Sequence, residues 1–221
     1  MRKYPLSIVV CWIVLVIGSG LAFAQGPDGN ENSGESGEIE CGYTAESTSG
    51  PYYVSGAPET DNLNFNDSPG QEMIISGTVL DGSTGEPIPG AQIEVWQTDA
   101  DGRYWPQASG DASDFDEDEL NFRGTVIADE DGAYEFTSVV PGAYSPRPRH
   151  IHYRISAEGY VPIFTQTYWA GDEAVSADRA DPDVDDCRLL VFEETEDGAV
   201  AATFNVVLRP DPDAPARPSL P

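Results

Sequence analysis

Lysine, histidine and long apolar runs are almost missing from this 221-residue sequence. Lysine occurs once, at Lys3, and histidine twice, against 39 aspartates and glutamates, so the formal net charge is −28. Because nucleic acids and anionic membranes attract Lys and Arg, we expect so acidic a chain to bind neither. No segment approaches the roughly 20 consecutive apolar residues that span a bilayer, so no membrane anchor is expected. An acidic surface without lysine also favours solubility at high salt, with an ordinary solvated surface as the alternative.

The first residues have the pattern of a secretory signal peptide. Arg2 and Lys3 precede an apolar run from Ile8 to Ile17, and Ala22-Phe23-Ala24 supplies a small-x-small cleavage pattern. We therefore predict a signal peptide over residues 1–24 and a secreted or periplasmic location. Its removal takes away two of the 11 basic residues, so the net charge of the mature chain becomes −30 (9 basic against 39 acidic).

The cysteines that remain after this cleavage are Cys41 and Cys187. An even number in an exported chain predicts a disulfide, here between an N-terminal arm and the loop before a strand at Leu189. Two unpaired cysteines are the alternative.

The composition divides the mature chain into four parts. Residues 25–40 are Gly, Asn, Ser and Glu with little that is apolar, which predicts a disordered acidic leader. We interpret 41–72 as an N-terminal arm, 73–210 as one catalytic domain and 211–221 as a flexible Pro-rich tail.

Short β-type runs separated by Gly and Pro turns fill the domain. One of them places Ala91, Ile93 and Val95 on one face and polar residues or Trp96 on the other, which predicts a half-buried strand. No run has a sustained helical period, so we predict an all-β fold, an antiparallel β-sandwich with an N-terminal arm. The expected strands are Met73–Leu80, Ala91–Gln97, Arg123–Ala128, Tyr134–Val139, His150–Ser156, Ile163–Trp169, Leu189–Glu193 and Thr203–Leu208.

Both histidines of the chain, His150 and His152, lie one residue apart in one of these runs. Alternate residues of a strand share a face, so two imidazoles can converge on one metal ion. An exposed strand face is the alternative interpretation.

Two tyrosines on turns extend this pair. Tyr144 lies in a Pro/Gly loop that leads into His150, and Tyr104 follows the turn Asp101-Gly102-Arg103. Two phenols and two imidazoles make a four-ligand set, and phenolate is a hard anionic donor that favours a hard trivalent ion. The set predicts ferric iron.

At these residues the sequence resembles the intradiol ring-cleaving dioxygenases, the family of catechol and protocatechuate dioxygenases. The similarity spans about residues 73–208, and Gly50-Pro51-Tyr52-Tyr53 is similar to the segment that enters the family's catalytic domain. The matching motifs are Gly77-Thr78-Val79, Pro89-Gly90-Ala91, Val95-Trp96-Gln97, Gly102-Arg103-Tyr104, Phe122-Arg123-Gly124, Asp131 to Phe136, Pro141 to Tyr144, Arg147 to His152 and Thr165 to Tyr168.

The resemblance implies a prealbumin-like sandwich and a site that holds Fe(3+). Tyr144 and His152 would be its axial ligands, and Tyr104 and His150 its equatorial ligands. Arg147 would be the active-site arginine and Gln166 a residue behind the ligands, while Tyr144 would leave the metal when substrate binds.

The substrates implied are a catechol-type small molecule and O2, and the product is a muconate-type diacid that contains both oxygen atoms. Plain catechol, a substituted catechol, hydroxyquinol and a lignin-derived aromatic all fit the sequence. Two other interpretations stay open: a prealbumin-like binding module without catalysis, and an iron-binding family member without catechol oxidation. The sequence indicates no oligomeric state.

Overall fold

The structure is a computed structural model that describes residues 41–214. The predicted signal peptide, the acidic leader and positions 215–221 of the tail lie outside the described residues. Within 41–214, no helix is long and apolar enough to cross a membrane.

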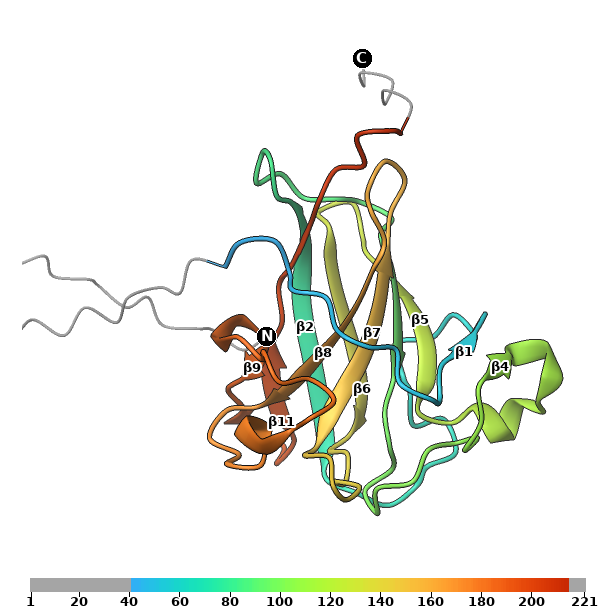
Figure 1. Ribbon diagram of the computed structural model, residues 1–221. Helices are drawn as coiled ribbons and strands as arrows, with labels where there is room; N and C mark the ends of the chain where they lie inside the picture. The colour runs from blue at the N-terminus through green and yellow to red at the C-terminus, as the bar shows by residue number, and fades with distance from the viewer. Residues whose placement is uncertain (1–40, 215–221) are drawn as a thin grey trace, which may run out of the picture. The chain divides into compact units, whose positions relative to one another are not determined.

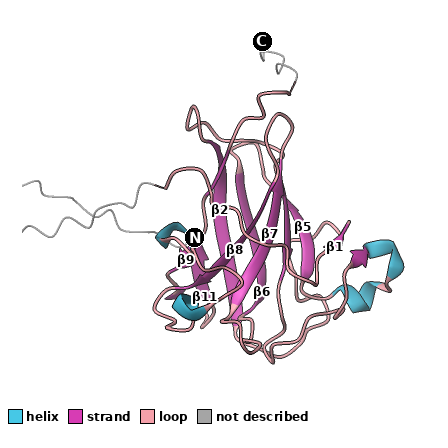
Figure 2. Ribbon diagram, in the orientation of Figure 1, coloured by secondary structure: helices cyan, strands magenta, loops and turns pink. Residues whose placement is uncertain are grey.

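Strands make up nearly all the regular structure of the described residues, and the helical turns are short 3-10 segments in loops (Figure 2). The strands are β1 (Val54–Ser55), β2 (Glu72–Asp81), β3 (Gln92–Trp96), β4 (Gly110–Asp111), β5 (Arg123–Ile127), β6 (Ala133–Val139), β7 (His150–Ser156), β8 (Ile163–Trp169), β9 (Leu189–Leu190), β10 (Glu193–Glu194), β11 (Val200–Thr203) and β12 (Val206–Leu208). The 3-10 turns are η1 (Ala112–Asp114), η2 (Glu117–Leu120), η3 (Val175–Ala177) and η4 (Asp186–Arg188).

Most of the strands form two five-stranded sheets (Figure 1). In the first sheet β10, β11, β2 and β12 follow one another and β6 pairs with β2; the second has the order β5-β3-β7-β8-β9. A small third pair joins β1 to β4. The sheets are open, and the all-β prediction is confirmed.

Apolar side chains from both five-stranded sheets share one core. The pattern of β2 alternates between buried and more exposed residues, so one of its faces packs inward. Rings from the two sheets meet there: the Phe136 ring of β6 lies 6.4 Å from the Tyr153 ring of β7, centroid to centroid. Ile93 and Val95 of β3 and Ile151 of β7 belong to the same buried cluster.

The predicted antiparallel arrangement holds for only part of the strand pairs. β2 pairs in parallel with both β11 and β12, and β8 pairs in parallel with β9. The last strands of the chain lie along β2 after a long connection, and nothing in the alternation of their side chains specifies direction.

Three strand predictions need correction. The run Leu189–Glu193 is divided between β9 and β10, which belong to different sheets. The run Thr203–Leu208 is broken because Phe204 and Asn205 leave the ladder: the Phe204 carbonyl accepts a hydrogen bond from the Tyr134 hydroxyl at 2.6 Å, and Asn205 Oδ1 accepts one from the Thr78 amide at 3.0 Å. The Ala91–Gln97 strand is not half-buried, since Trp96 on its second face is only 2% exposed. The segment after Cys41 covers that face.

This covering segment runs along β8 and then across the second sheet to β1, the blue trace in Figure 1. The Ser47 amide donates to the Phe164 carbonyl at 2.7 Å, and the Thr165 hydroxyl donates to the Ala45 carbonyl at 2.7 Å. Its start is fixed by a disulfide between Cys41 and Cys187. The sheet face turned away from the core is thereby enclosed.

Candidate metal centre

β7 presents both histidines on the face opposite the core. Ile151 and Tyr153 point into the hydrophobic core, so alternation sends His150 and His152 to the covered face. The two side chains are 2% and 1% exposed, and their Nε2 atoms lie 3.1 Å apart. The imidazoles converge as the sequence predicts.

Two glycines let the tyrosine loops meet above this strand. A Cβ on Gly102, whose φ is +83°, would lie 2.5 Å from the Ala143 carbonyl oxygen, and a Cβ on Gly142 would collide with the Gly102 amide. The loop that carries Tyr104 therefore packs directly on the loop that carries Tyr144. Only residues without a side chain allow that approach.

The tyrosines reach the histidines from these loops. Tyr104 Oη lies 3.3 Å from His150 Nε2, and the Tyr144 ring lies 5.5 Å from both the Tyr104 ring and the His150 ring. Tyr104 is 4% exposed, whereas Tyr144 is half-buried. The four predicted ligands thus form one cluster, in which Tyr144 is the phenol that solvent reaches.

The donor geometry fits a metal ion. Ligand atoms about 2.1 Å from one ion and at right angles lie about 3.0 Å apart, close to the 3.1 Å and 3.3 Å separations found here. His150 Nδ1 donates to the Pro148 carbonyl at 2.8 Å, so in the neutral ring Nε2 keeps its lone pair. Within residues 41–214 no three His, Cys, Asp or Glu side chains are grouped to hold a metal, so the candidate site is the mixed Tyr/His cluster.

Burial sets the protonation of the cluster. It lowers the pKa of His150 to about 4, with the Arg147 charge adding to the effect. Burial, His150 and Arg147 likewise hold the pKa of His152 well below its usual value, so both imidazoles are neutral at pH 7. The pKa of Tyr104 is raised well above its ordinary value, first by burial and then by Tyr144, while Arg147 and Arg123 oppose the rise. A bound cation would reverse that balance and favour the phenolate.

Arg147 is anchored beside the cluster. Its Nε donates to Asp178 Oδ2 at 2.8 Å, and its Nη2 donates to Gln166 Oε1 at 2.6 Å and to the Tyr168 hydroxyl at 3.0 Å. Burial alone would lower the pKa of Arg147, but the hydrogen bond to Asp178 and the negative charges of Tyr168, Asp178 and Tyr144 together outweigh burial, so the pKa is raised. The guanidinium is therefore a permanent, oriented positive charge.

Gln166 connects this arginine to the covering segment. Its Nε2 donates to the Thr48 carbonyl at 2.7 Å and to the Ser47 hydroxyl at 3.0 Å, while its Oε1 accepts from Arg147. Gln166 also lies opposite His152 in the β7–β8 register. Gln166 thus joins Arg147 to residues 47 and 48 of the covering segment.

Several residues around the site are not among those predicted from the sequence. Asp178 holds Arg147, and Asp181 accepts from the Tyr168 hydroxyl at 2.9 Å and pairs with Arg188 at 2.6 Å. Tyr168 could have been found, because it follows Gln166 by two residues and so shares its strand face. The two aspartates lie in an irregular loop and have no local signal.

The covering segment also lines the cluster. A Cβ on Gly50 would lie 3.1 Å from His152 Cε1, so the backbone packs directly on that ring. The Tyr52 ring lies 4.6 Å from the Tyr104 ring and 6.4 Å from the Tyr144 ring. Residues 50–52 therefore form one wall of the site.

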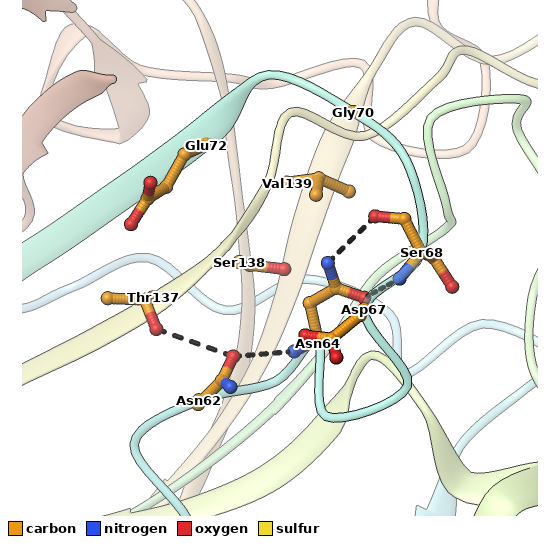
Figure 3. A pocket seen from close by; sticks show the side chains of 9 residues that line it. All are labelled: Asn62, Asn64, Asp67, Ser68, Gly70, Glu72, Thr137, Ser138 and Val139. Carbon is orange, nitrogen blue, oxygen red and sulfur yellow. Dashed lines mark hydrogen bonds between the residues drawn. The ribbon is translucent and has the colours of Figure 1, made fainter. Parts of the chain in front are cut away.

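A hollow lies apart from this cluster, between the start of β2, the end of β6 and the loop 62–70 (Figure 3). It has a volume of about 360 Å³ and a polar lining, much of which is already bonded within the loop: Asn64 exchanges hydrogen bonds with Ser68 at 2.9 Å. None of the predicted site residues lines it.

Comparison with known proteins assigns the family. The family model described as Dioxygenase matches residues 48–210. A chlorocatechol 1,2-dioxygenase of Rhodococcus opacus is 33% identical over 193 residues, which cover 76% of this chain and 73% of that protein. This chain belongs to the intradiol ring-cleaving dioxygenase family.

Other relatives show how much of an intradiol dioxygenase the chain represents. A catechol 1,2-dioxygenase of Pseudomonas sp. (strain EST1001) is 34% identical over 71% of this chain, but the match spans only 57% of that protein. The dioxygenase domain of a dioxygenase–carbohydrate-binding fusion from Streptomyces sp. SirexAA-E superposes with a TM-score of 0.64 at 27% identity, over 76% of this chain and 99% of that domain. The intradiol dioxygenase fold described here thus spans little more than half the length of the Pseudomonas enzyme.

Proposed function

We propose that this chain is a ferric-iron-dependent intradiol dioxygenase that cleaves a catechol-type ring between its two hydroxylated carbons. The observation that supports this most directly is the convergence of Tyr104, His150 and His152 at metal-ligand spacing. The Tyr144 ring lies beside them, 5.5 Å from the His150 ring. The relatives named catechol and chlorocatechol 1,2-dioxygenase support the same reaction and substrate class. The products would be muconate-type diacids that contain both atoms of O2.

The four side chains would hold the iron, which when bound would supply Lewis acidity that activates a catecholate toward O2. Tyr144 is the half-buried phenol, so its oxygen is the one placed to leave and to accept a proton from an incoming catechol hydroxyl. Tyr104 is buried and stays in place.

Arg147 would stabilise negative charge that develops on the ring. Asp178, Gln166 and Tyr168 occupy its Nε and Nη2 atoms, and the hydrogen bonds of the described residues give Nη1 no partner. A guanidinium held on one side is a preorganised charge, which needs no rearrangement during the reaction. Gln166 takes part by holding that orientation.

Two further proposals concern the fold and the location of the protein. We infer that the two sheets form a prealbumin-like sandwich with residues 41–72 as its N-terminal arm, which the shared core and the covering segment support. We infer export to an oxidising compartment, secreted or periplasmic, because the Cys41–Cys187 disulfide would not persist in a reducing one.

Oxygen uptake by the iron-loaded protein tests the proposal. The protein is assayed against catechol, chlorocatechols, hydroxyquinol and lignin-derived catechols, with product identification by mass spectrometry in ¹⁸O₂. We expect a ring-opened diacid that carries two labelled oxygens. A coloured iron protein that consumes no oxygen with any of them would be an iron-binding member without catechol oxidation. A colourless protein with stoichiometric iron would contradict tyrosinate ligation.

A further inference from the structure

Three arginines are buried in the described part of the chain, and one of them lacks a carboxylate partner. Arg147 pairs with Asp178 at 2.8 Å, and Arg188 pairs with Asp181 at 2.6 Å. Arg123 is 1% exposed and forms no ion pair with a described carboxylate. A buried cation without a counter-charge is strongly unfavourable. In a chain with 39 acidic residues, the absence of a carboxylate at this position requires a reason.

The acceptors of Arg123 are two neutral carbonyl groups. Its Nε donates to the Trp105 carbonyl at 2.6 Å and its Nη2 donates to the Pro106 carbonyl at 3.0 Å, while its buried Nη1 has no hydrogen-bond partner. Both carbonyls belong to the residues that directly follow Tyr104. The guanidinium therefore anchors the chain that positions this phenol.

Tyr104 is also the anion-forming group that faces Arg123. The Arg123 Cζ lies 6.0 Å from the centroid of the Tyr104 ring, within reach of a strong electrostatic interaction in a buried site. A phenolate at Tyr104 would supply the negative charge that Arg123 otherwise lacks.

The sheet fixes the cation relative to the histidines. Arg123 on β5 is paired with Trp96 on β3, and Trp96 is paired with His152 on β7. The Trp96 ring stacks on the His152 ring at 4.8 Å with an interplanar angle of 7°. Arg123 and the candidate ligand His152 thus lie at the same register, on either side of Trp96.

We propose that Arg123 is a positioning residue of the metal centre: it is the fixed counter-cation of the Tyr104 phenolate and the anchor of the backbone that follows it. This inference rests on the proposed function. Its role differs from that of Arg147, because its hydrogen bonds go to the ligand-bearing loop.

The energy of the tyrosinate-to-iron charge-transfer band tests the proposal. A positive charge near the phenolate lowers the energy of the phenolate electrons, so their transfer to iron requires more energy. Loss of the charge should therefore move the charge-transfer band to longer wavelength. Arg123→Gln removes the charge and keeps an amide donor, whereas Arg123→Lys keeps the charge. We expect a shift to longer wavelength and a roughly 10- to 100-fold weaker Kd for iron in Arg123→Gln, with the band of Arg123→Lys close to wild type.

A double variant assigns the effect to Tyr104. In the Tyr104→Phe background no phenolate faces Arg123, so adding Arg123→Gln should not shift the remaining band. Arg209→Gln is the matched control, since Arg209 also lies over a tyrosine ring, at 4.8 Å from that of Tyr43, but is exposed and outside the cluster. It should change neither the band nor the Kd.

The proposal is overturned if folded Arg123→Gln keeps the wild-type band and Kd, or if Arg123→Lys shifts the band as far as Arg123→Gln. It is also overturned if the shift persists in the Tyr104→Phe background, or if both Arg123 variants unfold, since the role is then only structural. If Arg123→Gln alone unfolds, the band of Arg123→Lys decides the question. A band at the wild-type position supports the proposal, and a shifted band overturns it. A failure of the iron site itself would be seen separately, as a colourless iron-loaded wild type.

Discussion

The hydrogen bonds of Asp178 within the described residues go to Arg147 and Ala180 and not to the Tyr/His cluster, yet its substitution should affect both stability and turnover. The Asp178 and Arg147 side chains are 2% and 8% exposed, and Arg147 Nε and Nη2 both lie 2.8 Å from the same carboxylate oxygen. Asp178→Asn leaves a buried guanidinium without its counter-charge, which costs about 3–5 kcal/mol. At about 2–4 °C per kcal/mol for a chain of this size, Tm should fall by roughly 6–20 °C.

The same substitution should lower kcat more than it changes KM. Arg147 would keep its bonds to Gln166 and Tyr168, so the guanidinium stays in the site but is less firmly oriented. A displacement of about 1 Å in a catalytic group can cost up to about a hundredfold in rate. We expect a loss of roughly ten- to a hundredfold in kcat.

Thermal unfolding by circular dichroism and oxygen uptake measure the two effects. Asp185→Asn is the control, because Asp185 contacts Arg188 at 3.3 Å and is 43% exposed, so its loss should cost less than about 1 kcal/mol. The double variant Arg147→Met/Asp178→Asn removes both charges and should be more stable than the sum of the single losses predicts. Additive losses in the double variant, or a Tm for Asp178→Asn equal to that of the control, would refute the reasoning.

Three further predictions follow from the site and the disulfide. Tyr104→Phe should weaken iron retention and change the visible spectrum both before and after anaerobic catechol addition. Tyr144→Phe should change mainly the spectrum before catechol is added. If both variants keep the wild-type spectra, neither tyrosine is a ligand. The double variant Cys41→Ser/Cys187→Ser removes a disulfide that spans 146 residues. On the chain-entropy model this should lower the free energy of unfolding by about 5 kcal/mol. Urea unfolding measures the loss, and an unchanged midpoint would contradict the prediction. The iron-free protein should lose stability as pH falls below about 6.5 toward 4, because the histidines of the unfolded chain bind protons in this range and those of the folded chain do not. Burial lowers the pKa of His150 to about 4 and holds the pKa of His152 well below its usual value. The double variant His150→Gln/His152→Gln should flatten this slope.

Local alternation was sufficient to predict the strands that carry the site. His150–Ser156 and Ile163–Trp169 have the bounds expected from the sequence. The first strand has an apolar face that packs on the core, and Ile163 of the second belongs to the same core. The four candidate ligands come together because two of them alternate on β7 and two follow tight glycine turns. Each of these features is visible within a few residues of sequence.

Features that depend on distant contacts could not be predicted in this way. The parallel pairing of β2 with β11 and β12 joins segments more than 100 residues apart, and a strand's side-chain pattern is the same in either direction. Asp178 and Asp181 are two of 39 acidic residues, and their loop has no periodicity that marks them. Only the fold shows that they face Arg147 and Tyr168.

The same contrast between strand and loop indicates which ligand can exchange. His150 and His152 are side chains of a strand whose opposite face is locked in the core, so their displacement would disturb the whole sheet. Tyr104 is on a loop, but it is buried and Arg123 binds the carbonyls that follow it. Tyr144 is on a loop, is half-buried and borders the wall formed by residues 50–52. A bidentate catechol on the proposed iron would need a second coordination position, and Tyr144 is the candidate ligand whose departure would disturb the least packing.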